Sequence, residues 1–327
     1  MTSHATRHEE ARAALAQGLD DELRPLRHLR ARPRATELLC VIGGYAVGAG
    51  LVLRGMAQAD HRGGVALWIA GTFVAAVALN ASVLLMHEGM HGVLFASPRL
   101  NRWVSVLCGL PVLMSFSAYR VLHLRHHRHL GSDGDPDEYR NYAGSPLVVY
   151  ALQYVRLSVG CYLYLLMIPR LAWRHGDAQD RRRIAAEYAL LVAVFAALFA
   201  LVPGAAMLWA WFVPVAVVAL FTSARGLTQH GLTDVDDPLL ASRSLRPGRL
   251  VSTLLLNENL HLEHHLFPEV PSYHLPALQR LLDDRLPRRC EGRSYLAFLG
   301  RFFLQSLRLD ESPVGVRSTT AEPSDAR

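Results

Sequence analysis

The sequence predicts an all-α membrane protein with about four transmembrane helices in two hairpins, interfacial or re-entrant helices, and a cytoplasmic His-rich cap. Three observations support this prediction. Hydrophobic residues make up 51% of the 327 residues and the mean hydropathy is +0.17. The apolar residues collect in long runs instead of being spread evenly. Clusters of histidine and arginine follow the ends of these runs.

The first hairpin is predicted over Glu37–Leu53 and Val65–Met86, which a polar turn separates. A helix needs roughly 20 apolar residues to cross a hydrocarbon core about 30 Å thick, and both segments approach that length. The second hairpin is predicted within Glu187–Ala224, which is too long for one span. Pro203 and Gly204 interrupt it near its middle, where a proline breaks a helix. Together these segments give four spans.

Two further apolar segments are expected to lie at the interface or to re-enter the membrane. Trp103–Tyr119 is short and contains Pro111. Pro146–Ile168 is long enough to cross, but five arginines follow it within Arg170–Arg183. Such clusters favour the cytoplasm, and a full crossing would place this one outside. Every loop rich in His and Arg is then predicted on the cytoplasmic face of an inner or plasma membrane.

Charge and cysteine content argue against a nucleic-acid-binding protein and against cysteine-based metal or redox sites. All 34 basic residues are Arg, which with abundant Ala indicates a GC-rich bacterial coding bias. The net charge of +6 does not indicate nucleic-acid binding, because the arginines flank apolar segments, where anionic lipid head groups of a bilayer are the expected partners. The four cysteines form no C-x-x-C pair, so a zinc ribbon, a rubredoxin-like centre and a thioredoxin-like motif are unsupported.

Nine of the 16 histidines form an ordered series of clusters. They are His87 and His91 in H-E-G-M-H, His123, His126 and His127 in H-L-R-H-H, His230 in Q-H-G-L-T, and His261, His264 and His265 in H-L-E-H-H. In H-x-x-H-H the first two histidines are neighbours on a helix, and the third points about 100° away, toward a second metal ion. Eight clustered imidazoles exceed what one tetrahedral zinc accepts, which favours two ions. Imidazole suits iron, zinc, copper or nickel, so spacing does not name the element.

Two other classes of function use part of this pattern. H-E-G-M-H matches the H-E-x-x-H signature of zinc proteases, in which His87 and His91 bind zinc and Glu88 activates water. That interpretation needs one more ligand and leaves at least five matched histidines unexplained. A non-catalytic metal scaffold or a metal transporter is the other alternative. Transporters usually place polar ligands within their spans, whereas these histidines follow the span ends.

The histidine clusters resemble the three histidine boxes of the membrane fatty-acid desaturase and hydroxylase superfamily. The context is also similar: Gly92 follows the first box, Asp135-Pro136-Asp137 follows the second, and Asn257 to Pro271 surrounds the third. The resemblance covers roughly residues 40–290. It implies that the eight box histidines bind two iron ions (Fe2+/Fe3+), that O2 is a co-substrate, and that His230 is a ninth ligand. Catalysis then needs no side chain beyond the metal ligands.

The resemblance implies an O2-dependent desaturase that acts on an acyl chain or a similar lipid. Hydroxylation or ketolation of a carotenoid or a small acyl-type substrate, by the same superfamily, is the alternative. The electron donor is expected to be a separate protein, because we find no fused cytochrome b5 segment and no Cys cluster for an iron–sulfur centre. A ferredoxin with its reductase, docking on the Arg-rich cytoplasmic surface, fits by charge complementarity.

Polar residues beside the boxes are candidates for a supporting role. Acidic side chains orient metal-binding imidazoles through their second ring nitrogen, and ordinary surface charge or pairing with Arg125 or Arg128 is the alternative. The acidic candidates are Glu88, Asp135, Asp137, Asp234 and Glu263, and Asn257 or Asn259 is a candidate for a water contact near the metals.

Three regions of the chain are expected. Residues 1–36 form a cytoplasmic N-terminal segment, residues 37–309 the desaturase-like membrane and catalytic domain, and residues 310–327 a disordered tail. Within the first region, residues 8–27 have the pattern of an amphipathic surface helix, either on the membrane or against the rest of the protein.

Overall fold

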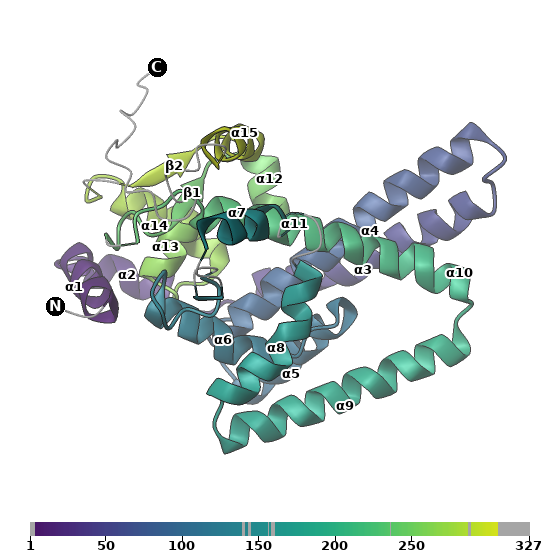
Figure 1. The fold of residues 1–327 in the computed structure, drawn as a ribbon, viewed down its shortest axis with the longest axis horizontal. Helices are drawn as coiled ribbons and strands as arrows, with labels where there is room; N and C mark the ends of the chain where they lie inside the picture. Colours follow the sequence, from purple (N-terminus) through teal and green to yellow (C-terminus); the bar gives the residue numbers. More distant parts are fainter. Residues whose placement is uncertain are drawn as a thin grey trace. The chain divides into compact units, whose positions relative to one another are not determined.

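The computed structural model describes residues 4–138, 141–142, 145–155, 157, 161–235, 237–286 and 289–306. The described part is almost entirely helical, which confirms the predicted all-α class (Figure 1). Its α-helices are α1 (His4–Ala16), α2 (Asp20–Leu26), α3 (Ala31–Met56), α4 (Arg62–Met90), α5 (Pro98–Gly109), α6 (Phe116–His129), α7 (Pro146–Val155), α8 (Cys161–His175), α9 (Ala178–Leu201), α10 (Gly204–Ala206), α11 (Val213–His230), α12 (Arg249–Leu254), α13 (His261–Leu266), α14 (Leu275–Leu282) and α15 (Tyr295–Ser306).

Shorter elements connect these helices. Leu110–Val112 and Ser272–His274 are single 3-10 turns, and Met207–Phe212 is a π-helical segment between α10 and α11. The strands β1 (Arg243–Leu245) and β2 (Cys290–Gly292) pair in parallel, with Arg243 opposite Cys290. The expected tail, residues 310–327, lies outside the described residues.

Among the described residues, four helical segments are long and apolar enough to cross a membrane, which confirms the predicted number of spans. They are Ala31–Met56, Arg62–Met90, Ala178–Leu201 and Gly204–His230. The last two are separated at the predicted break. Val202 is extended, with φ −107° and ψ 132°, because the residue before a proline is disfavoured in the helical region. The helix therefore stops at Leu201 and restarts at Gly204.

The chain divides into two compact units, which we call the membrane unit and the histidine unit. The membrane unit comprises residues 29–122 and 161–222. The histidine unit comprises residues 1–28, 123–160 and 223–327.

Within the membrane unit, α3 and α4 lie side by side as a hairpin (Figure 1). Glycines permit the close approach. A Cβ added at Gly48 would lie 2.5 Å from the backbone nitrogen of Ala75, and one added at Gly55 would lie 2.5 Å from that of Trp68. Helices in lipid gain no hydrophobic stabilisation from pairing, so small residues that allow backbone contact hold them together.

The segment Trp103–Tyr119 is divided as its proline predicts. Helix α5 begins after Ser97, whose hydroxyl accepts from the backbone N–H of Leu100, and gives way to a 3-10 turn at Leu110. Leu113 then adopts a left-handed conformation, with φ 60°. The helices on either side meet at 100°, which is the geometry of a broken span or a re-entrant loop.

The segment Pro146–Ile168 is shared between α7 and α8. Residue 156 and residues 158–160, which lie between these helices, are outside the described residues. No candidate span among the described residues includes this segment. Its expected placement at the interface, and the membrane side of the histidine clusters, stay predictions.

The N-terminal helices α1 and α2 pack inside the histidine unit. Leu15, Leu19 and Leu23 are buried in an apolar cluster with residues 260–286. Arg12 and Arg27 both form ion pairs with Glu269. The single helix predicted over residues 8–27 is wrong, because Gly18 adopts a left-handed conformation with φ 73° between α1 and α2. Of the two placements left open for this segment, the structure has both helices against the protein.

We predict that Gly48→Ala destabilises the hairpin whereas Gly43→Ala does not. The new methyl group at position 48 meets backbone atoms of α4, and overpacking of this kind typically costs about 1–3 kcal/mol. A Cβ built at Gly43 lies within 4 Å of no atom beyond its chain neighbours and the backbone of its own helix. Alanine at this position therefore only improves the helix propensity. Thermal unfolding in detergent, followed by tryptophan fluorescence, compares the two. Equal midpoints would contradict the close packing of α3 on α4.

Candidate metal centre

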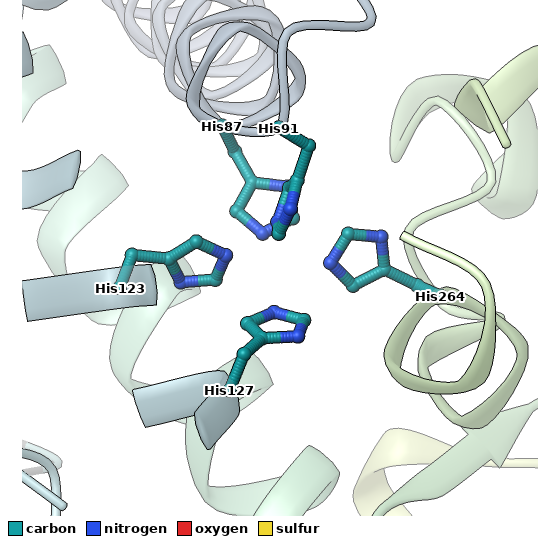
Figure 2. A group of neighbouring side chains, drawn as sticks. All are labelled: His87, His91, His123, His127 and His264. Carbon is teal, nitrogen blue, oxygen red and sulfur yellow. The ribbon is translucent and has the colours of Figure 1, made fainter. Parts of the chain in front are cut away.

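The first histidine pair occupies the last turn of α4 and the residue that follows. His87 and His91 are four residues apart, and their ring centroids lie 5.4 Å from each other. Gly92 ends the helix with φ 76°, and the N–H of Val93 donates back to the carbonyl of Glu88 at 3.1 Å. This left-handed C-terminal turn favours glycine, which explains the His-Gly sequence. Figure 2 shows both rings at this helix end.

In the histidine unit, four imidazoles form what we call the His230 cluster: His126, His230, His261 and His265. The Nε2 atom of His261 lies 3.0 Å from Nε2 of His230 and 3.1 Å from Nε2 of His265. Ring nitrogens of His126, His230 and His265 lie within 4.8 Å of one another. Two ligands about 2.1 Å from one ion and at right angles to each other are separated by about 3.0 Å. The observed separations fit that arrangement.

A second group, the His264 cluster, contains His123, His127 and His264. These residues offer ring nitrogens within 4.8 Å of one another, and Figure 2 shows the three rings pointing toward a common space. The ring centroids of His127 and His264 are 5.2 Å apart.

The two clusters correct one detail of the sequence interpretation. We expected the first and second histidines of H-x-x-H-H to act together. Instead the first and third share a cluster: His123 with His127, and His261 with His265, while the middle histidine belongs to the other cluster. Spacing of four residues places side chains almost directly above each other on a helix, which explains this pairing.

Burial favours the neutral form of the His265 ring. Desolvation lowers the pKa of His265 well below its ordinary value, and the neighbouring rings of His127 and His261 lower it further. A neutral imidazole retains one nitrogen lone pair for a metal ion. Among the described residues, Nδ1 of buried His265 has no hydrogen-bond partner. A donor set made only of imidazoles, most of them buried, fits a transition-metal ion.

Asp135 holds the ring of His126. Its carboxylate oxygens lie 2.9 and 3.1 Å from Nδ1 of His126, and it also accepts from the N–H groups of Gly131 and Asp137. Burial alone would raise the pKa of Asp135, but the His126 ring and these N–H groups outweigh it and lower the pKa. An ionised Asp135 requires the proton of a neutral His126 on Nδ1, so the lone pair that can bind a metal ion is on Nε2. Asp137 lies nearby, with Oδ2 3.8 Å from the same Nδ1.

Two other predicted supporting residues bind partners outside the histidine boxes. Glu88 forms a buried ion pair with Arg34 of α3. Glu263 is fully buried, which raises its pKa, and it accepts from Ser244 and from Gln279.

The remaining three candidates contact the backbone. Asn257 donates to the carbonyl of Ser272, and Asn259 donates to that of Leu245. Asp234 lies in the turn after α11, where its N–H donates to the carbonyl of Leu240.

One important carboxylate was missed by the sequence analysis. Glu187, on the membrane-spanning helix α9, accepts hydrogen bonds from Arg102, from the hydroxyls of Ser115 and Ser117, and from the N–H of Ser117, at 2.6–3.0 Å. The two serines stand at the start of α6, so an anion from another helix caps the helix that carries the second box. A lone acidic residue at the edge of a long apolar run was the available signal.

Sequence comparisons show that this chain is similar to known proteins over the region that carries the histidine clusters. The sequence profile described as "Fatty acid desaturase" matches residues 63–297, which include all nine histidines. The chain is 27% identical over 232 residues to a sphingolipid delta(4)-desaturase/C4-monooxygenase of Bos taurus, covering 68% of each chain. It is 30% identical over 203 residues to a beta-carotene ketolase of Paracoccus sp. (59% of this chain, 72% of the relative). It is 22% identical over 242 residues to an sn-1 oleoyl-lipid 12-desaturase of Arthrospira platensis (65% and 69%).

We predict that Asp135→Asn weakens metal binding by about 10- to 100-fold, the usual effect of losing a hydrogen-bond partner of a ligand. The amide is nearly isosteric but no longer fixes the His126 proton on Nδ1. Asp133→Asn, at an exposed position of the same loop, is the matched control and should bind normally. Titration of the metal-free protein with ferrous iron measures both. Equal affinities would remove Asp135 from the support of His126.

We predict that Glu187→Ala lowers the free energy of unfolding by about 3 kcal/mol, because buried hydroxyl and N–H donors left without an acceptor cost about 1–3 kcal/mol each. Asp60→Ala, in the exposed turn between α3 and α4, should have little effect. Thermal midpoints of the two variants in detergent provide the comparison. A small loss for Glu187→Ala would mean that water replaces the carboxylate.

Proposed function

The chain belongs to the fatty acid desaturase family, and from this membership we propose that it is an O2-dependent di-iron desaturase of an acyl chain or a similar lipid. That it is an oxidoreductase follows from the family. The observation that best supports the finer proposal is the division of the histidine unit's imidazoles into two clusters. Each cluster takes rings from both α6 and α13, so two neighbouring ions would share the same supporting helices.

We assign the ligands as follows. His126, His230, His261 and His265 hold one iron. His123, His127 and His264 bind the other. The first box, His87 and His91, supplies the remaining two nitrogens, an assignment that rests on the order of the boxes in the sequence. Neutral imidazoles suit Fe2+ among several metals, and the family favours iron over zinc, copper or nickel.

The bound irons would supply oxygen activation and removal of hydrogen from an unactivated C–H bond. The chain's own residues have a different task. Asp135 fixes the orientation and proton position of His126. Burial of His264 and His265, at 0% and 2% exposed, keeps bulk water away from the metal-binding nitrogens. Because burial also keeps His265 neutral, the ligand set stays competent near neutral pH.

Oxygen insertion is the alternative outcome on the same site. The names of two relatives support it, since one combines desaturase with C4-monooxygenase activity and the other is a ketolase. The zinc-protease alternative loses its basis. The family match includes all nine clustered histidines, and Glu88, which would have to activate water, is ion-paired with Arg34.

Two further proposals concern the membrane and the electron donor. The protein spans a membrane several times, and we propose a bacterial inner or plasma membrane with the histidine boxes on the cytoplasmic side. A ferredoxin with its reductase would deliver electrons. Exposed arginines at positions 170, 174 and 182 support an acidic partner, and lipid head groups would use the same charges.

We predict about two irons per chain in the purified protein, as eight or nine imidazoles require. A chelator should remove the metal and abolish turnover, and ferrous iron should restore both. One zinc without iron would contradict the proposal. Mass spectrometry of lipids from cells that express the protein distinguishes an alkene product from an alcohol or a ketone.

The matched variants are His264→Ala and His274→Ala. The first removes a ring from the His264 cluster and should eliminate iron at that position together with activity. His274 is the residue before α14 and belongs to neither cluster, so its replacement should retain iron. Full turnover of His264→Ala would contradict the ligand assignment.

A further inference from the structure

The strand β1 is three residues long. Each of its residues forms a hydrogen bond with a segment that contains or directly precedes a histidine of the His230 cluster. Arg243, Ser244 and Leu245 are 9%, 0% and 2% exposed. Their partners lie in two separate parts of the chain, the end of α11 and the segment around α13. The strand therefore joins the two segments whose histidines lie closest together.

Arg243 binds the end of α11. One guanidinium nitrogen donates to the carbonyls of Thr228 and Gly231 at 3.1 and 2.7 Å, and another donates to that of Leu232 at 2.9 Å. The guanidinium carbon also lies 4.6 Å from the centre of the Phe298 ring. These carbonyls surround His230, the last residue of the helix. A cation at a helix C-terminus is stabilised by the macrodipole and satisfies carbonyls that have no partner within the helix.

The next two residues bind the third box. The hydroxyl of Ser244 accepts from the N–H of Leu262 at 3.0 Å and donates to Glu263, both within α13. The N–H of Leu245 donates to the carbonyl of Asn259 at 2.8 Å, and the Asn259 amide donates to the carbonyl of Leu245 at 2.7 Å. These contacts fix the backbone on both sides of His261.

We propose that Arg243 is the positioning residue that sets His230 opposite His261, with β1 as the common support. The inference rests on the proposed metal site. His230 and His261 come from segments far apart in the sequence, and their Nε2 atoms lie 3.0 Å apart. Metal–ligand distances vary by only about 0.2 Å, so the end of a helix, which tends to fray, needs such an anchor.

The guanidinium is specific to this task. Its planar fork reaches three carbonyls from two nitrogens while its face packs on Phe298. A lysine ammonium is a single point of charge and does not reproduce this geometry. Arg243→Lys therefore retains the charge and removes the anchor.

The experiment uses the full-length protein in nanodiscs, stripped of metal and titrated anaerobically with ferrous iron. Arg243→Lys should weaken binding of the iron at the His230 cluster by about 10- to 100-fold, the usual effect of losing support for a ligand. Arg246→Lys is the matched control: it follows β1, but its guanidinium forms surface ion pairs with Asp283 and Glu291. Equal affinities for the two variants would overturn the proposal.

A double-mutant cycle distinguishes positioning from general stability. If Arg243 acts through His230, then Arg243→Lys should have no further effect on iron affinity in the His230→Ala protein. An undiminished effect in that background would mean that Arg243 acts elsewhere. Leu282→Ala, in the buried cluster around α14, should lower the thermal midpoint without a comparable loss of affinity. If Leu282→Ala and Arg243→Lys lost iron affinity and thermal midpoint to the same extent, Arg243 would only stabilise the fold and the proposal would be wrong.

A metal-free measurement separates this inference from the proposed function. Arg243→Lys should speed amide hydrogen exchange over residues 226–233 in the apo-protein, and Arg246→Lys should not. If the wild-type protein takes up no iron, the proposed function is wrong. Amide hydrogen exchange then still tests whether Arg243 holds the end of α11. Unchanged exchange in Arg243→Lys would overturn the inference even if the wild type binds iron.

Discussion

The histidine unit depends on holding seven imidazoles close together, five of them buried. A protonated ring would repel its neighbours and lose the lone pair that binds a metal ion, so a metal site here requires neutral and correctly oriented rings. Desolvation and neighbouring rings lower the pKa of His265, and Asp135 determines which nitrogen of His126 carries the proton. Hydrogen bonds of Ser244 and Asn259 connect β1 to the short helix α13 and to the segment before it, and α13 carries three of the rings. Much of the polar bonding in the histidine unit serves this requirement.

A second constraint acts on the charged groups of the membrane unit. Arg34 and Glu88 are each 1% exposed and neutralise each other between the two helices of the first hairpin. The Glu187 carboxylate forms an ion pair with Arg102 and accepts hydrogen bonds from serines at the start of α6. An unpaired charge in such a place would cost several kcal/mol, so both pairs fix the register of the helices that they join. The positions of the histidine boxes on α4 and α6 thus follow from electrostatics as well as from apolar packing.

The sequence was sufficient for the helical class, the four spans and the resemblance to the desaturase family, because long apolar runs and histidine spacing are local signals. It was not sufficient for contacts between distant segments. The pairing of Glu88 with Arg34 and of Glu263 with Ser244 depends on which segments face each other, which spacing along the chain does not reveal. The same reason explains why Glu187 and Arg243 were overlooked. The pairing within H-x-x-H-H was misjudged because spacings of three and four residues both place side chains on one helix face.

The docking of α1 and α2 has a consequence for biosynthesis. Leu15, Leu19 and Leu23 emerge from the ribosome well before their apolar partners around α13 and α14, which lie more than 200 residues later in the sequence. The leading helices must therefore wait, with an apolar face uncovered, while all four spans are inserted. Contacts between such distant segments form late, and the uncovered face is prone to aggregation in the meantime. Completion of the histidine unit thus requires synthesis as far as α14.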